Sequence, residues 1–115
     1  AICDAAMTEL IRPALYQAHH DVLAATKRGA PIRVDLVGPV CESADFLARD
    51  RELAVAQGAL LAIMDCGAYS AVRATNYNAR PRPAEILVDG DEAHVVRERE
   101  TLAQLYASES RLPGT

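Results

Sequence analysis

The chain has 115 residues and a formal net charge of −4, and half of its residues are hydrophobic. This length suits one domain with a single hydrophobic core. The negative charge argues against nucleic acid or an anionic membrane as the main partner, and no segment reaches the roughly 20 apolar residues that span a bilayer. The first ten residues lack the basic start and apolar core of a secretory signal. We therefore expect a cytoplasmic protein.

The three cysteines, Cys3, Cys41 and Cys66, are an odd number without CxxC spacing or clustered histidines. This pattern argues against a disulfide framework or a zinc site and favours a reducing compartment. Cys3 and Cys66 lie within apolar runs, so we expect both in the core.

The first half of the chain predicts short strands around one helix. Residues 1–5 form an apolar run that predicts a buried strand, and the run begins as though cut from a longer polypeptide. Residues 8–19 predict a helix that Thr8 caps and that tolerates Pro13 early in its course. Further strands are predicted at residues 22–26 and 32–37, with a turn at 27–31 between them.

The second half adds a hairpin and a short helix. Residues 43–53 are highly charged and predict irregular or partly helical structure, whereas the apolar run at 59–65 predicts a buried strand. The sequence Asp-Gly-Asp-Glu at 89–92 separates two β-prone runs and predicts a hairpin. Thr101 is the expected cap of a helix that extends to residue 107, before a frayed tail at 112–115. Five or six short strands with little helix predict a mainly β domain over residues 1–115, a barrel or a sandwich.

Three segments together resemble the C-terminal domain of diaminopimelate decarboxylases. They are LIRPALYQAHH (10–20), VGPVCESADFL (37–47) and DCGAYSAVRATNYNARPRPAEILVDG (65–90). The segments occur in the order and approximate spacing of that family. Ala6 stands where the family commonly has glycine, which adopts positive φ angles that alanine resists.

The resemblance implies a fold-type III enzyme that depends on pyridoxal 5′-phosphate (PLP). An N-terminal β/α barrel would hold the cofactor, and this chain would be the Greek-key β-barrel or sandwich-like C-terminal domain with short helices. The family forms head-to-tail homodimers with active sites at the subunit interface. Its reaction converts meso-2,6-diaminopimelate to L-lysine, the last step of lysine biosynthesis.

The cofactor lysine is not expected in this chain. PLP enzymes hold their cofactor through a Schiff-base lysine, and the only lysine here, Lys27, lies in a KRGAP turn that matches no such context. We therefore expect the Schiff-base lysine in the N-terminal barrel, and the isolated chain to be inactive.

The resemblance assigns Cys41 as the catalytic residue that reprotonates the substrate's α-carbon. A thiol has an ordinary pKa of about 8.5, so it carries a proton to donate at neutral pH. Outside the GPVCES context, an inert cysteine at a strand end would be the simpler interpretation.

Arg12, Tyr16 and Glu42 are the predicted substrate-binding residues. The far end of diaminopimelate bears an ammonium and a carboxylate, and a desolvated charge without a partner is costly. Glu42 suits the ammonium, and the planar guanidinium of Arg12 suits the carboxylate. Tyr16 follows Arg12 by four residues and adds a hydroxyl on the same helical face. Without the resemblance, Arg12 would be interpreted as a solvated residue at a helix start, and Tyr16 as a residue at the rim of an amphipathic helix.

Tyr69 resembles the family tyrosine that contacts the PLP phosphate and lies near the substrate, so we predict it in both cofactor and substrate binding. Tyr77 and Asp4 stay open between structural and functional roles. The histidine pair at 19–20 is predicted as a solvated strand start, because no third metal ligand is apparent. Residues 97–100, RERE, predict a salt-bridged surface.

Two alternatives stay open on the residues alone. One is a fold-type III decarboxylase for ornithine, arginine or carboxyspermidine, whose cationic substrate tail offers no carboxylate to Arg12. The other is a non-catalytic regulatory homologue, which should have lost the site residues that are present here.

Overall fold

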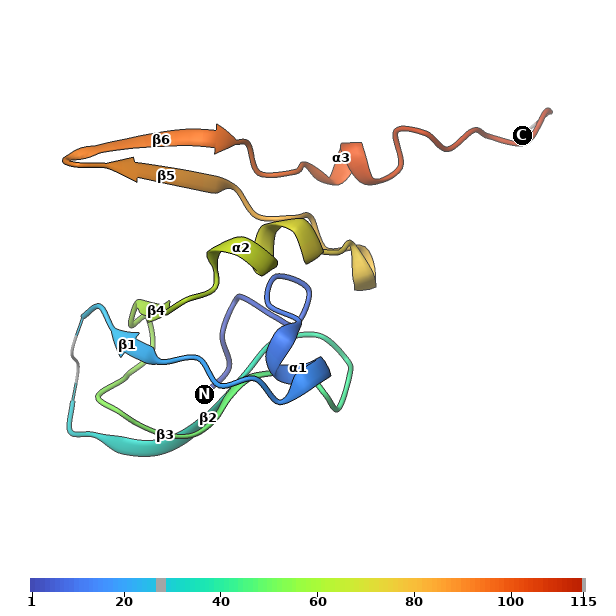
Figure 1. The fold of residues 1–115 in the computed structure, drawn as a ribbon. Helices are drawn as coiled ribbons and strands as arrows, with labels where there is room; N and C mark the ends of the chain where they lie inside the picture. The colour runs from blue at the N-terminus through green and yellow to red at the C-terminus, as the bar shows by residue number, and fades with distance from the viewer. Residues whose placement is uncertain (27–28, 115) are drawn as a thin grey trace. The chain divides into compact units, whose positions relative to one another are not determined.

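The computed structural model describes residues 1–26 and 29–114. The chain divides into two compact units, unit 1 (Ala1–Ala74) and unit 2 (Thr75–Thr115), which Figure 1 shows as a ribbon. Lys27 and Arg28 of the predicted turn, and Thr115 of the predicted tail, lie outside the described residues.

Unit 1 contains two antiparallel strand pairs. Strand β1 (Val22–Ala24) pairs with β4 (Leu61–Ile63), and β2 (Ile32–Val37) pairs with the longer β3 (Phe46–Leu53). The strand expected at 32–37 is confirmed, and the one expected at 22–26 is confirmed over Val22–Ala24. The run at 59–65 forms the shorter, half-buried β4.

The prediction for residues 43–53 is wrong, because most of this charged segment is β3. Its apolar residues, Leu47 among them, face the core, whereas the charged middle of the strand is exposed. There the ladder with β2 shifts register, and Asp50 adopts a left-handed φ of 58°. Asp50 N–H donates to Asp35 Oδ1 at 2.7 Å, and the Asp50 carboxylate pairs with Arg33. This irregularity interrupts the alternation that marks a strand in a sequence.

The N-terminal segment makes one bridge instead of the predicted buried strand. Ile2 forms an isolated parallel bridge with Val37, and Cys3 N–H donates to the Val37 carbonyl at 2.8 Å. The Ile2 side chain is 82% exposed. The buried strand expected at residues 1–5 is therefore wrong.

The predicted helix at 8–19 is reduced to α1 (Arg12–Tyr16). Thr8 is buried in the preceding turn, where its hydroxyl donates to Glu9 Oε2 at 2.8 Å, so it is not the cap. Pro13 lies in the first turn of α1, where its missing N–H costs nothing. The helix stops at Gln17, whose φ of 55° is left-handed.

The core of unit 1 gathers around Leu36 and Leu47, which are 0% and 1% exposed. Its other buried members are Leu10, Val22, Ala48 and Leu53. Cys3 and Cys66 pack against this cluster as half-buried free thiols, which agrees with their expected place in the core. Burial is the main cause that raises the pKa of each of these two thiols.

Unit 2 contains the predicted hairpin and helix. A short 3₁₀ turn, η2 (Tyr77–Ala79), precedes β5 (Glu85–Asp89) and β6 (Glu92–Arg97), which pair antiparallel across Gly90 and Asp91. Gly90 has the positive φ, 59°, that such a tight turn requires. Thr101 caps α3 (Leu102–Leu105) through a reciprocal capping box with Gln104. The hairpin and the cap are confirmed, and the helix ends at Leu105 instead of residue 107.

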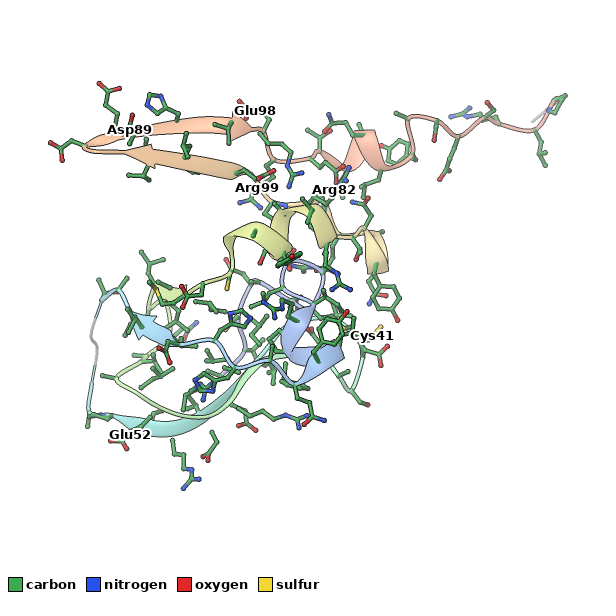
Figure 2. All side chains as sticks on the ribbon, in the orientation of Figure 1. Cys41, Glu52, Arg82, Asp89, Glu98 and Arg99 are labelled. Atoms are coloured by element: carbon green, nitrogen blue, oxygen red, sulfur yellow. The ribbon has the colours of Figure 1, made fainter. Side chains whose placement is uncertain are left out.

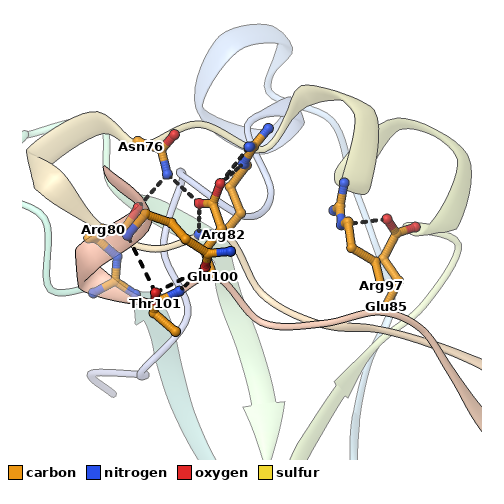
Figure 3. A network of polar contacts seen from close by, with 8 residues as sticks. Asn76, Arg80, Arg82, Glu85, Arg97, Glu100 and Thr101 are labelled. Atoms are coloured by element: carbon orange, nitrogen blue, oxygen red, sulfur yellow. Dashed lines mark hydrogen bonds and ion pairs between the residues drawn. The ribbon is translucent and has the colours of Figure 1, made fainter. Parts of the chain in front are cut away.

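A carboxylate joins the two ends of this hairpin (Figure 3). Glu100 Oε1 accepts hydrogen bonds from Arg82 Nε at 2.9 Å and Nη2 at 2.5 Å, while Oε2 accepts from the Arg82 backbone N–H at 2.8 Å and from Asn76 Nδ2 at 2.6 Å. These bonds, those of the Arg82 side chain first, lower the pKa of Glu100 to about 2. Arg97 Nε pairs with Glu85 Oε1 at 2.8 Å. The salt-bridged character predicted for residues 97–100 thus rests on Arg97 and Glu100.

The six strands and few short helices of the described residues confirm the mainly β class. Within the described residues, the strands pair only two by two, so a closed Greek-key barrel stays a prediction. None of the helices in this part of the chain has the length and apolar content to cross a bilayer.

Candidate active site

Two arginines and two tyrosines on neighbouring short helices form a cluster in unit 1, called here the Arg–Tyr cluster. Arg12 and Tyr16 lie on α1. Tyr69 lies on α2 (Gly67–Ser70), and Arg73 ends the 3₁₀ turn η1 (Ala71–Arg73) that follows it. Arg12 and Tyr16 are four residues apart on one α-helix, so their side chains project from the same face. Tyr69 and Arg73 are also four residues apart, on the consecutive turns α2 and η1.

The cluster is joined crosswise between the helices. The Arg12 guanidinium carbon lies 5.7 Å from the centre of the Tyr69 ring, and that of Arg73 lies 5.3 Å from the Tyr16 ring. Arg73 Nη1 also donates a hydrogen bond to Tyr16 Oη at 3.1 Å. These are cation–π distances, so each ring attracts the guanidinium without neutralising it.

The arginines of the cluster, Arg12 and Arg73, form no ion pair among the described residues. Tyr16 and Tyr69 are each 59% exposed. The cluster therefore presents two cationic groups and two phenols to solvent, an arrangement that suits a carboxylate or a phosphate ligand.

A second set of predicted residues lies on the loop between β2 and β3. Cys41 and Glu42 are both exposed on this loop, from which Figure 2 shows Cys41 projecting. The loop is tightly turned, because Glu42 N–H donates to the Val40 carbonyl at 2.8 Å and Asp45 N–H donates to the Glu42 carbonyl at 3.0 Å.

A buried carboxylate secures this loop to the N-terminal segment. Asp45, only 5% exposed, accepts the backbone N–H of Val40 at 2.8 Å through Oδ2 and that of Met7 at 2.7 Å through Oδ1. A Cβ on Gly38 would overlap Asp45 Oδ2 and lie 2.7 Å from Ala6 Cα. Glycine at position 38 thus allows the close approach that shapes the Cys41 loop.

Ala6 fits without the strain that its replacement of glycine suggested. It is fully buried against Gly38 and is not among the residues with positive φ. The backbone here therefore accommodates a side chain.

The adjacent histidines His19 and His20, which the sequence analysis treated as one pair, have different environments in the structure. His19 is exposed, with Nε2 3.2 Å from Asp21 Oδ1, as expected for a solvated position. His20 is only 5% exposed, and its Nδ1 lies 3.0 Å from the Met64 carbonyl, so its predicted solvation is wrong. His20 thus links the segment before β1 to the segment after β4 by a hydrogen bond. No group of three His, Cys, Asp or Glu side chains suited to a metal ion occurs among the described residues.

The structure thus brings Arg12, Tyr16 and Tyr69 together, with Cys41 and Glu42 on a separate loop. Their functional roles stay predictions. Asp4, exposed near the N-terminus of unit 1, and Tyr77, which opens η2 in unit 2, keep no assigned role. Arg73 was missed by the sequence interpretation. Its position four residues after Tyr69 repeats the Arg12–Tyr16 spacing, which is the signal that could have identified it.

Comparison with known proteins identifies the family of this chain. Residues 1–67 match the family model described as pyridoxal-dependent decarboxylase, C-terminal sheet domain. The chain is 61% identical over 114 residues to the diaminopimelate decarboxylase of Pseudomonas aeruginosa and 54% identical over 114 residues to that of Vibrio cholerae. Each match covers 98% of this chain but only 28% and 27% of the respective relative.

Among solved structures, diaminopimelate decarboxylase of M. jannaschii in complex with L-lysine superposes with a TM-score of 0.92 at 41% identity. The match covers 97% of this chain and 26% of that one. The fold and the family match together lead to one conclusion: this chain belongs to the pyridoxal-dependent decarboxylase family, as its C-terminal sheet domain.

Proposed function

We propose that this chain completes the active site of a PLP-dependent decarboxylase that converts meso-2,6-diaminopimelate to L-lysine. The observation that carries the substrate assignment is Arg12, whose guanidinium contacts the Tyr69 ring and no carboxylate in the described part of the chain. Such a group is ready to pair with a carboxylate at the far end of the substrate. The named relatives support the same substrate.

This chain offers a contact for the PLP phosphate but not the covalent anchor of the cofactor. The exposed phenol of Tyr69, with the Arg12 charge beside it, suits the PLP phosphate. The single lysine of the chain, Lys27, matches no cofactor-binding context, so we assign the covalent anchor to a separate β/α barrel domain. When bound there, PLP supplies the electron sink for the bond that releases carbon dioxide.

Recognition of the far end is divided between the cluster and the loop. Arg12 offers two parallel N–H donors to the distal carboxylate, and Tyr16 adds its hydroxyl. Glu42 accepts from the distal ammonium. Within unit 1, Tyr16, Cys41 and Glu42 are exposed and Arg12 is half-buried, so each of them can reach a ligand at a subunit interface. We therefore propose a homodimer with shared active sites.

Cys41 Sγ holds the proton that the α-carbon needs after carbon dioxide leaves. The thiol is exposed on the loop that Asp45 secures, beside Glu42 in the sequence. One loop would thus set both the proton donor and an acceptor for the distal ammonium.

The experiment that tests the proposed function is a substrate comparison. The chain, joined to its barrel domain and loaded with PLP, is assayed for carbon dioxide release from meso-diaminopimelate, ornithine and arginine. We expect kcat/KM for diaminopimelate to exceed the others by about 100-fold or more, because a site built for a polar group leaves it unpaired with the wrong substrate. Preference for ornithine or arginine would refute the assignment.

The role of Cys41 has its own test. Cys41→Ala in the same full-length enzyme should lower kcat by about 100-fold or more, the usual contribution of a positioned proton donor. Ser43→Ala, on the same exposed loop, is the matched control and should leave kcat unchanged. Normal lysine formation by the Cys41 variant would exclude this thiol as the acid.

A further inference from the structure

We propose that Arg73 is a positioning residue that turns Tyr16 into a dedicated hydrogen-bond donor for the distal carboxylate of the substrate. The inference rests on the proposed function and deepens it, because it explains how the site would distinguish a carboxylate from an ammonium at the same place. Arg73 needs no contact with the substrate for this role.

The geometry first shows that Arg73 restrains Tyr16. Tyr16 is 59% exposed near the end of α1, so packing alone leaves its side chain considerable freedom. Arg73 limits that freedom by two contacts, a guanidinium 5.3 Å from the ring centre and a hydrogen bond of 3.1 Å to the hydroxyl. Together they set both the plane of the ring and the direction of Oη, and so reduce the entropy lost when a ligand binds.

The hydrogen bond from Arg73 then decides whether the Tyr16 hydroxyl acts toward a ligand as a donor or as an acceptor. A phenol can donate one hydrogen bond and accept others, whereas a guanidinium only donates. The bond from Arg73 Nη1 therefore makes Oη an acceptor toward Arg73, and the Tyr16 proton must point elsewhere. In the described part of the chain, no acceptor takes that proton. A carboxylate oxygen satisfies it, and an ammonium does not.

The second pair of the cluster is built differently. Arg12 lies over the Tyr69 ring at 5.7 Å, and its guanidinium donates no hydrogen bond to another described residue. All of its N–H donors stay available for a bidentate contact. Arg73 instead directs one donor at Tyr16. The same residue type thus binds the ligand at position 12 and orients another side chain at position 73.

The test is a double-mutant cycle in the full-length PLP-loaded enzyme. Tyr16→Phe removes the donor, and Arg73→Met removes the group that orients it while keeping a long side chain. Each change should raise KM for meso-diaminopimelate by about tenfold and leave kcat within about twofold, because a hydrogen bond to a charged group is lost. The double variant should match the larger single effect, since the two residues act through one contact.

Two further variants keep the experiment decisive. Arg49→Met is the matched control, because Arg49 also stacks on an aromatic ring, that of Phe46 at 3.7 Å, outside the cluster; its KM should not change. Arg73→Lys keeps the charge and a donor but not the planar fork, and should give an intermediate KM. It replaces Arg73→Met in the cycle if circular dichroism shows that the methionine variant is unfolded.

The outcomes separate the two proposals. An unchanged KM in Arg73→Met, or multiplicative effects of the two single changes in the double variant, would overturn the role of Arg73 while leaving the decarboxylase intact. Absence of diaminopimelate turnover by the unmutated enzyme would instead refute the proposed function, and the inference with it.

Discussion

Two arginines of unit 1 and two arginines of unit 2 make opposite kinds of contact. In unit 1, Arg12 and Arg73 lie against tyrosine rings, and the structure shows no carboxylate beside either within the described residues. In unit 2, Arg82 and Arg97 pair with the carboxylates of Glu100 and Glu85. Arg82 and Glu100 together link the segment before β5 to the segment after β6.

Under the proposed function, this difference separates arginines that act on the substrate from arginines that hold the fold. A carboxylate neutralises a guanidinium and occupies its donors, so the pair contributes to structure. A tyrosine ring attracts the guanidinium but leaves its charge and most of its donors for a ligand. Loss of the first kind should weaken the hairpin, and loss of the second should weaken substrate binding.

The largest expected effect follows from Arg12. Arg12→Ala in the full-length enzyme should lower kcat/KM for diaminopimelate by about 100-fold or more, because the distal carboxylate would be desolvated without a partner. The thermal midpoint should stay nearly unchanged, since Arg12 has no charge partner in the described chain. Steady-state kinetics and a thermal melt on the same sample measure both.

Arg82→Ala is the reciprocal variant. It should leave KM unchanged and increase hydrogen exchange of the β5 and β6 amides, because Glu100 loses its main partner. If Arg12→Ala altered stability alone, or Arg82→Ala altered KM alone, the division between the two kinds of arginine would be wrong.

A smaller effect is expected from Asp45, the carboxylate that secures the Cys41 loop. Asp45 accepts two backbone N–H groups and is buried, so Asp45→Asn places an amide N–H₂ against one of them. An unpaired buried donor costs about 1–3 kcal/mol. Hydrogen exchange should show lost protection at the Val40 and Met7 amides, together with a lower kcat through the Cys41 loop.

Asp35→Asn provides the comparison for that variant. Asp35 also accepts a backbone N–H, that of Asp50, but it is exposed. Water can replace the lost acceptor there, so the cost should be smaller. If Asp35→Asn and Asp45→Asn lost equal protection from hydrogen exchange, the burial of Asp45 would not account for its effect.

The sequence predicted local structure best where short-range chemistry decides it. The turn at Gly90 and the cap at Thr101 depend on residues next to one another, and both are confirmed. Strand β3 was missed because its register shift and the left-handed Asp50 break the two-residue period. That bulge depends on Arg33 and Asp35 from the partner strand, which no local pattern contains.

The candidate site shows the same limit. Arg12, Tyr16 and Tyr69 could be named from their motifs. Their contact requires α1 and α2 to lie near each other, and the spacing of residues in the sequence does not predict that proximity. Arg73 was overlooked because no motif marked it. Its importance appears only once its contact with Tyr16 is known. The burial of His20 was likewise decided by the approach of Met64 from a distant segment.

The smallest expected effect is the pH response of the hairpin in unit 2. Folding lowers the pKa of Glu100 from 4.5 to about 2. A group with a lowered pKa stabilises the folded state above its unfolded pKa, and the contribution fades as pH falls from 4.5 toward 2. Hydrogen exchange in the full-length protein should therefore show protection of the β5 and β6 amides that decreases as pH falls from 6 to 3.

Glu100→Gln should lower protection at pH 6 and remove most of this pH dependence, whereas Glu98→Gln, an exposed change in the same run, should preserve it. Equal pH dependence in both variants would assign the response to another group and leave the Arg82–Glu100 pair without a measurable role in holding the hairpin.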